Sequence, residues 1–100
     1  MATLRFISDS AHGWLEVPTV DVAAAGVTPS RYSYIDATNG MTYLEEDCDI
    51  AGFLSALGVA LADVPDVVQH IATYRYSMGN CWIRELPHCS GQGFVSPFAR

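Results

Sequence analysis

The alternation of apolar and polar residues predicts two short strands near the start of the chain. Residues 4–7 and 14–17 have strand-like composition, and the second segment ends at a proline, as strands often do. The next segment, 19–26, predicts a short helix that begins at Thr19, its expected N-cap, and ends in a glycine.

A β-hairpin is the clearest local signal. Residues 31–35 and 41–45 are rich in aromatic and β-favouring residues, and the segment between them contains Asn39-Gly40, which suits a tight reversal. If the tyrosines of the two strands share a face, they form an aromatic patch of Tyr32, Tyr34 and Tyr43. We expect this patch to be core beneath a helix; an exposed interaction surface is the alternative.

The strongest helical pattern runs from Asp49 to about Leu61. Its apolar residues recur at the spacing of one helical stripe: Ile50, Phe53, Leu54, Leu57 and Leu61. Pro65 prevents simple continuation of this helix. Residues 66–76 fit either a strand or a second helix, and their β-branched and aromatic content favours a strand.

The last third of the chain carries weaker patterns. Residues 77–80 predict a turn, 81–86 predict a strand, and 88–100 have no period and are expected to wrap the surface. Together the elements predict a single α+β domain over residues 1–100. It should contain an antiparallel sheet of four to five strands, with one main helix packed on it and one short helix.

The charge balance narrows the choice of partner. The 100 residues are 50% apolar and include five Arg, no Lys and eleven acids, for a net charge of −6. A chain this acidic should be repelled by phosphate backbones, so direct nucleic-acid binding is not expected, whereas a basic protein surface is a suitable partner. The alternative is that the charge serves only to keep a small apolar protein in solution.

The sequence predicts a cytoplasmic setting. It shows no apolar run of signal-peptide length and none near the roughly 18 residues that a membrane span needs. Three cysteines without an export signal favour free thiols in a reducing compartment.

Four acids stand close together at the start of the main helix: Glu45, Glu46, Asp47 and Asp49. Asp47 is the expected N-cap and Asp49 the expected first-turn acid, which leaves Glu45 and Glu46 unexplained. A calcium loop is not expected, because Ile50, Ala51 and Leu54 supply no side-chain oxygens.

The sequence contains no clear motif for a catalytic site or a metal site. A zinc site would draw on Cys81, His88 and Cys89, with Cys48 and His70 nearby, but no C-x-x-C spacing is present. A thiol nucleophile would need a base such as His12 or His70, and no local signature marks one. We therefore predict no catalytic, metal or cofactor residues.

Four segments carry a family resemblance: FISDSAHGWLEVP, SRYSYI, YLEEDCD and IRELP. As a set they resemble a group of small acidic proteins carried by bacteriophages, prophages and plasmids. The resemblance covers about half of the chain and implies no catalytic residue. It implies a phage accessory protein, and such proteins often inhibit host defence, anti-CRISPR proteins included.

The leading hypothesis is a non-enzymatic, anti-CRISPR-like inhibitor that acts as a DNA mimic. Its acidic face would occupy a basic nucleic-acid channel of a bacterial defence complex, through Glu45, Glu46, Asp47 and Asp49, with Asp9 and Glu16. The first alternative is a homodimeric assembly module that pairs through the tyrosine patch or a strand edge. The second alternative is a small enzyme that depends on a metal or on a cysteine, using Cys48, Cys81 or His70.

Overall fold

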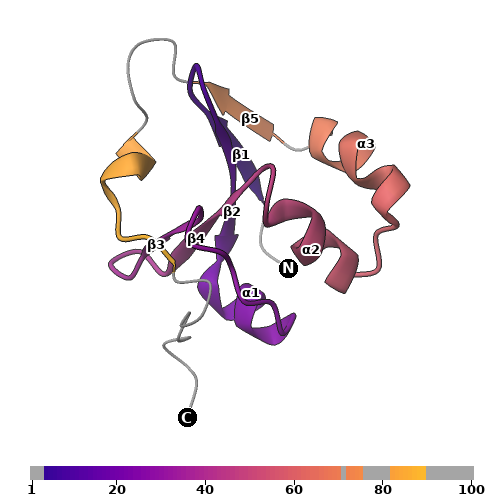
Figure 1. Cartoon of the computed structure of the whole chain (residues 1–100), viewed down its shortest axis with the longest axis horizontal. Coiled ribbons are helices and arrows are strands. Elements are labelled where there is room, and N and C mark those ends of the chain that lie inside the picture. The colour runs from indigo at the N-terminus through magenta and orange to yellow at the C-terminus, as the bar shows by residue number, and fades with distance from the viewer. Residues whose placement is uncertain (1–3, 71, 76–81, 90–100) are drawn as a thin grey trace.

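The fold is α+β, as predicted, and is built on one five-stranded sheet. The computed structural model describes residues 4–70, 72–75 and 82–89. The sheet has the order β3-β4-β2-β1-β5 (Figure 1). Its strands are β1 (Arg5–Ser8), β2 (Gly13–Pro18), β3 (Tyr34–Asp36), β4 (Met41–Glu45) and β5 (Ala72–Arg75).

Four of the strands pair in the antiparallel manner that the sequence predicts, and the fifth does not. β5 lies parallel to β1, at the edge of the sheet opposite β3. The segment between β4 and β5 contains helices, and a helical crossover returns the chain in its original direction, which makes the new strand parallel. The sheet is therefore mixed rather than wholly antiparallel.

The helices are shorter than the sequence predicts. They are α1 (Thr19–Ala24), α2 (Ile50–Ala56) and α3 (Val64–Gln69), with 3₁₀ turns η1 (Leu61–Asp63) and η2 (Trp82–Glu85). The predicted helix over 49–61 is wrong at its C-terminal end, because Gly58 takes a left-handed φ of 96° just beyond α2. Leu57 and Leu61 consequently leave the buried stripe and are 42% and 69% exposed.

Two further predictions are corrected in the second half of the chain. Residues 66–76 were expected to be one element, but they contain the end of α3 and then β5. Residues 81–86 were expected to form a strand, and most of them form η2 instead. Pro65 lies in the first turn of α3, where a proline sacrifices no helical hydrogen bond. The predicted turn at 77–80 and nearly all of 88–100 lie outside the described residues.

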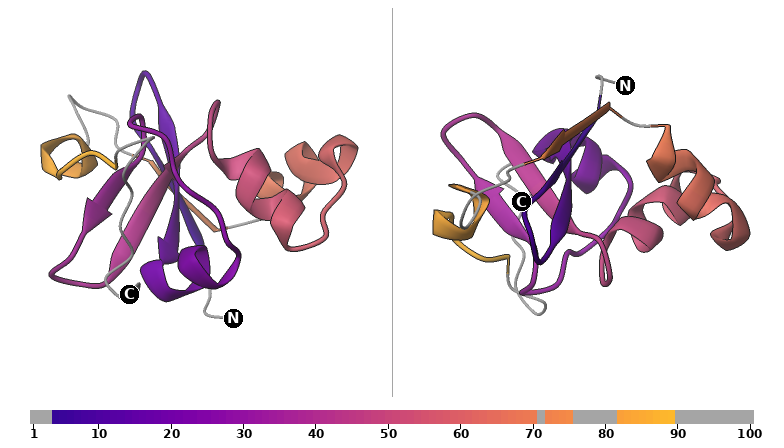
Figure 2. Two further views of the ribbon diagram at one scale, coloured as in Figure 1. Left: turned by 60° about the horizontal axis from the view of Figure 1, so that its bottom comes forward. Right: turned by 90° about the horizontal axis from the view of Figure 1, so that it is seen from above.

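The two faces of the sheet carry two separate cores, as strand alternation requires. One face packs against helices through Leu15, Val17, Val22, Leu44, Ile50, Phe53 and Leu54. The other face buries Ile7, Trp14, Tyr34, Tyr43 and Ile83 beneath η2. Figure 2 shows α2 and α3 on one side of the sheet and η2 on the other. This second face carries the candidate site.

The predicted hairpin is present as β3 and β4, with Gly40 at a φ of 71° before β4. Tyr34 lies opposite Tyr43, and both are buried, so most of the tyrosine patch is core as expected. Its cover is the 3₁₀ turn η2, whose Trp82 ring meets the Tyr43 ring edge-on at 5.1 Å. Tyr32 lies before β3 and is exposed.

Candidate functional site

The six acids predicted to share one exposed face are divided between the interior and the surface. Four of them are only 5–8% exposed: Asp9, Glu16, Glu45 and Asp49. Glu46 and Asp47 are exposed. The prediction of a six-residue acidic surface is therefore wrong for the four buried carboxylates, and each of these has partners that explain its burial.

Asp9 anchors η2 to the turn between β1 and β2. Its carboxylate accepts hydrogen bonds from Arg84 Nε at 2.6 Å and Arg84 Nη2 at 3.1 Å. It also accepts from the backbone N–H groups of Ala11 and His12, at 2.9 and 3.0 Å. A buried carboxylate with a bidentate arginine and two amide donors is a well-satisfied structural group.

Glu16 connects neighbouring strands on the same face of the sheet. Its carboxylate accepts two 2.8 Å hydrogen bonds from Arg5 and a 3.0 Å bond from the Tyr43 hydroxyl. The hydrogen bond from Arg5 lowers the pKa of Glu16 and outweighs the opposing effect of burial. Glu16 therefore stays ionised as part of the sheet.

Asp49 fixes the loop before β3. Its carboxylate accepts hydrogen bonds from the Ser30 N–H, the Ser30 hydroxyl and the Ser33 hydroxyl. Asp49, not Asp47, occupies the N-cap position of α2, and its side chain makes no capping bond because it is turned toward these serines. The prediction of Asp47 as the N-cap is thus wrong.

Glu45, which the sequence left unexplained, closes the turn between β4 and α2. One carboxylate oxygen, Oε1, accepts from the N–H groups of Asp47 and Cys48, at 3.0 and 2.9 Å. The other oxygen, Oε2, lies 3.7 Å from Nδ1 of His12. The side chain is thereby held in place at the end of β4.

Glu46 and Asp47 remain as the exposed part of the acidic run, here called the acidic turn. Neither forms an ion pair with an arginine in the described parts of the chain. Partial burial raises the pKa of Glu46, and the Asp47 and Glu45 carboxylates raise it further. The acidic turn therefore concentrates negative charge without an arginine counter-ion among the described residues.

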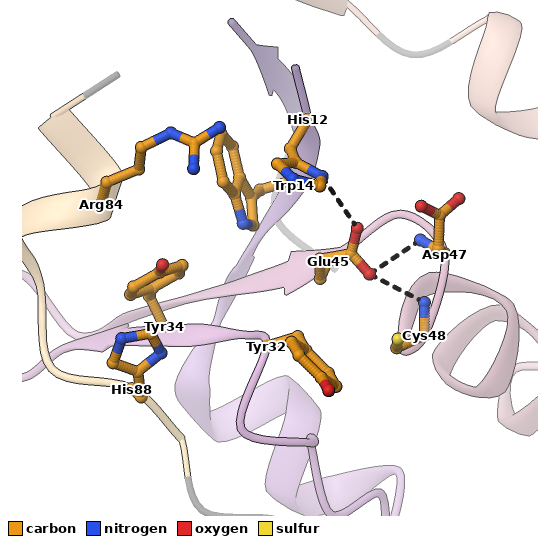
Figure 3. A pocket seen from close by; sticks show the side chains of 9 residues that line it. All are labelled: His12, Trp14, Tyr32, Tyr34, Glu45, Asp47, Cys48, Arg84 and His88. Atoms are coloured by element: carbon orange, nitrogen blue, oxygen red, sulfur yellow. Dashed lines mark hydrogen bonds and ion pairs between the residues drawn. The ribbon is translucent and has the colours of Figure 1, made fainter. Parts of the chain in front are cut away.

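A pocket of about 390 Å³ lies beside the acidic turn, on the face of the sheet that η2 covers. Its lining comes from the β1–β2 turn, the end of β4, the loop before β3 and the segment from η2 onward. The lining residues are His12, Trp14, Tyr32, Tyr34, Glu45, Asp47, Cys48, Arg84 and His88 (Figure 3).

Aromatic groups form one wall of this pocket. The Trp14 ring meets the Tyr34 ring edge-on at 6.1 Å, and Tyr34 lies 4.4 Å from the His88 ring. The Arg84 guanidinium lies 5.2 Å above Trp14 while it is bound to Asp9. The indole N–H of Trp14 is buried and has no hydrogen-bond partner among the described residues.

Four possible metal ligands converge at the edge of the pocket. Ligand atoms of His12, Glu45, Glu46 and Asp47 all lie within 4.8 Å of one another. The zinc set considered from the sequence does not assemble in this way: in the described part of the chain, no group of three or more possible ligands includes a cysteine. Cys81 lies outside the described residues.

Sequence reasoning missed most of the pocket. His12, Trp14 and Arg84 come from segments that are distant from the acidic run. His12 and Trp14 meet it through pairing of β2 with β4, in which Trp14 lies opposite Glu45, and Arg84 reaches the pocket from η2. One signal was available in the sequence. His12 lies just before the predicted strand that begins at Trp14, and a histidine in this position can face the end of a neighbouring strand.

Comparison with protein families, with curated proteins and with solved structures found no match. Among the described residues, no helix is long and apolar enough to cross a membrane. The geometry of the site therefore carries the functional argument.

Proposed function

We propose that this protein is a non-enzymatic inhibitor that binds a basic protein surface through the acidic turn. The observation that carries the proposal is that Glu46 and Asp47 are exposed and have no arginine partner among the described residues. Carboxylates placed in this way can substitute for phosphates against the arginines and lysines of a partner.

The distribution of charge supports this choice of surface. Two of the four buried acids are neutralised within the fold, Glu16 by Arg5 and Asp9 by Arg84. The acidic turn lies next to a pocket whose rim includes exposed Tyr32 and His88, which offer contact area to a partner. Aromatic residues beside charged ones are typical of binding surfaces.

The resemblance to phage accessory proteins supplies the class of partner. We propose a nucleic-acid-binding complex of bacterial defence, and anti-CRISPR activity in the host cytoplasm as the form to test. A homodimer that pairs through the whole tyrosine patch is disfavoured, because Tyr34 and Tyr43 are buried.

A phage-plating assay tests the proposal. In a host with an active CRISPR system that targets the phage, expression of the protein should restore plaques. The E46K/D47K double variant should lose this protection, since both carboxylates change sign. The D63K/D66K variant makes the same change in charge at two exposed acids outside the pocket, and should still protect. Equal protection by both variants would refute the role of the acidic turn.

A further inference from the structure

The edge of the pocket has the donor set of a transition-metal site. It combines one imidazole, from His12 in the β1–β2 turn, with three carboxylates that end β4 and begin the following turn. We propose that His12, Glu45, Glu46 and Asp47 bind one divalent transition-metal ion, with Zn²⁺ bound more tightly than Mn²⁺. This inference goes beyond the proposed inhibition and does not depend on it.

The distances suit shared coordination of an ion. His12 Nδ1 and Glu45 Oε2 are 3.7 Å apart, which is too long for a hydrogen bond. Two ligand atoms of a tetrahedral ion with bonds of about 2.1 Å lie about 3.4 Å apart, so this pair needs only a small side-chain adjustment. All four ligand atoms lie within 4.8 Å of one another. Because Glu46 and Asp47 are exposed, rotamer changes can bring their carboxylate oxygens to coordination distance.

The central ligand is already oriented by a second layer of hydrogen bonds. Oε1 of Glu45 accepts from the N–H groups of Asp47 and Cys48, which leaves Oε2 directed toward His12 (Figure 3). Metal sites commonly fix their ligands in this way. The cluster is thus more than exposed acids in proximity, since its central carboxylate is 6% exposed and held in place.

An independent feature of the same pocket also points to a polar ligand. Trp14 is 1% exposed, and its indole N–H has no hydrogen-bond partner in the part of the chain that the structure describes. In Figure 3 the indole nitrogen lies at the end of the ring that is nearer Tyr34. Buried donors without an acceptor are rare, and a water or anion held on the ion would bring an oxygen into this pocket.

The first test is calorimetric titration of the chelator-treated protein with Zn²⁺. We expect one site per chain. The H12A variant should bind Zn²⁺ at least about tenfold more weakly, and it should fold normally because the His12 side chain is 47% exposed. The D63N/D66N variant, which removes exposed acids elsewhere, should keep the wild-type affinity. Absence of saturable binding, or equal affinity in wild type and H12A, would overturn the proposal.

The second test locates the ion and separates this site from the cysteines. Mn²⁺ favours carboxylate and imidazole over thiolate, and it broadens NMR signals of nearby nuclei. Substoichiometric Mn²⁺ should broaden the amide signals of residues 12–14 and 45–48 before all others, and H12A should remove this selectivity. Broadening centred elsewhere would refute the site. Neither test requires a partner protein, so loss of inhibition and loss of the metal site are separate outcomes.

Discussion

Adjacent carboxylates in this chain have opposite roles. Glu45 is the last residue of β4, and its side chain turns inward to accept two backbone hydrogen bonds, whereas Glu46 begins the turn and is exposed. The same division separates Asp49, which is bound to serines, from exposed Asp47. Charge counted along the sequence therefore overstates the charge that a partner can reach.

The ion pair of Glu16 with Arg5 should make the thermal stability of the fold depend on pH. The pKa of Glu16 is lowered in the folded state, so its contribution to stability is complete above the unfolded pKa of about 4.3 and is lost as the pH falls through the folded value. The E16Q variant should melt below wild type at pH 7, and the difference should shrink toward pH 3.

Thermal unfolding followed by circular dichroism at pH 7, 5, 4 and 3 measures this effect. The D63N variant, at an exposed acid, is the matched control and should track wild type throughout. A difference between E16Q and wild type that stays constant over the whole range would contradict the assigned pKa direction.

The two cysteines for which burial is described should differ in reactivity. Cys48 is exposed, whereas Cys89 is buried, and burial raises the pKa of Cys89 to about 12. Iodoacetamide at pH 8 should therefore modify Cys48 in the native protein and reach Cys89 only after unfolding. Peptide mass spectrometry measures the extent of modification at each cysteine. Comparable labelling of both residues in the native protein would contradict the burial of Cys89.

At the scale of elements, two glycines of the α2 region should respond in opposite ways to alanine. Gly52 lies within α2, and an added Cβ would meet nothing within 4 Å, so G52A should stabilise the fold by roughly 0.5–1 kcal/mol. Gly58 has a φ of 96°, so G58A should cost about 1–2 kcal/mol. Urea unfolding measures both, and effects of the same sign would refute this account of where α2 ends.

Elements defined by local pattern were predictable from the sequence. The strands at β1 and β2, the short helix α1 and the β3–β4 hairpin follow from alternation, proline and glycine positions within a few residues. The length of α2 was not predictable in this way, because the stripe of leucines continues past the glycine that ends the helix. Hydrophobic periodicity shows which residues are apolar, but it does not show at which residue a helix ends.

The candidate site was only partly predictable, because it is built by pairing between distant strands. The acidic run was evident, but its partner residues His12 and Arg84 reach it through the β2–β4 pairing and through η2. The sequence predicted a strand where η2 lies, so Arg84 could not be placed beside Asp9. Burial of Asp9, Glu16, Glu45 and Asp49 follows from these long-range contacts.

At the scale of the whole molecule, the two faces of the sheet differ in what covers them. Helices cover one face (Figure 2) and complete an apolar core. The other face carries aromatic residues, satisfied carboxylates and the pocket beside the acidic turn. Both proposals use this second face. The inhibition requires the charge of the acidic turn, and the metal site requires the convergence of that turn with His12.

The central claim is that the acidic run contains two buried structural carboxylates, Glu45 and Asp49, and two exposed ones, Glu46 and Asp47. Urea unfolding of four isosteric variants tests it most directly: E45Q, E46Q, D47N and D49N. We expect D49N and E45Q to lose about 1–3 kcal/mol each, because buried donors lose a charged acceptor. The E46Q and D47N variants should stay within about 0.5 kcal/mol of wild type. Equal stability losses in all four, or none in D49N and E45Q, would contradict the claim.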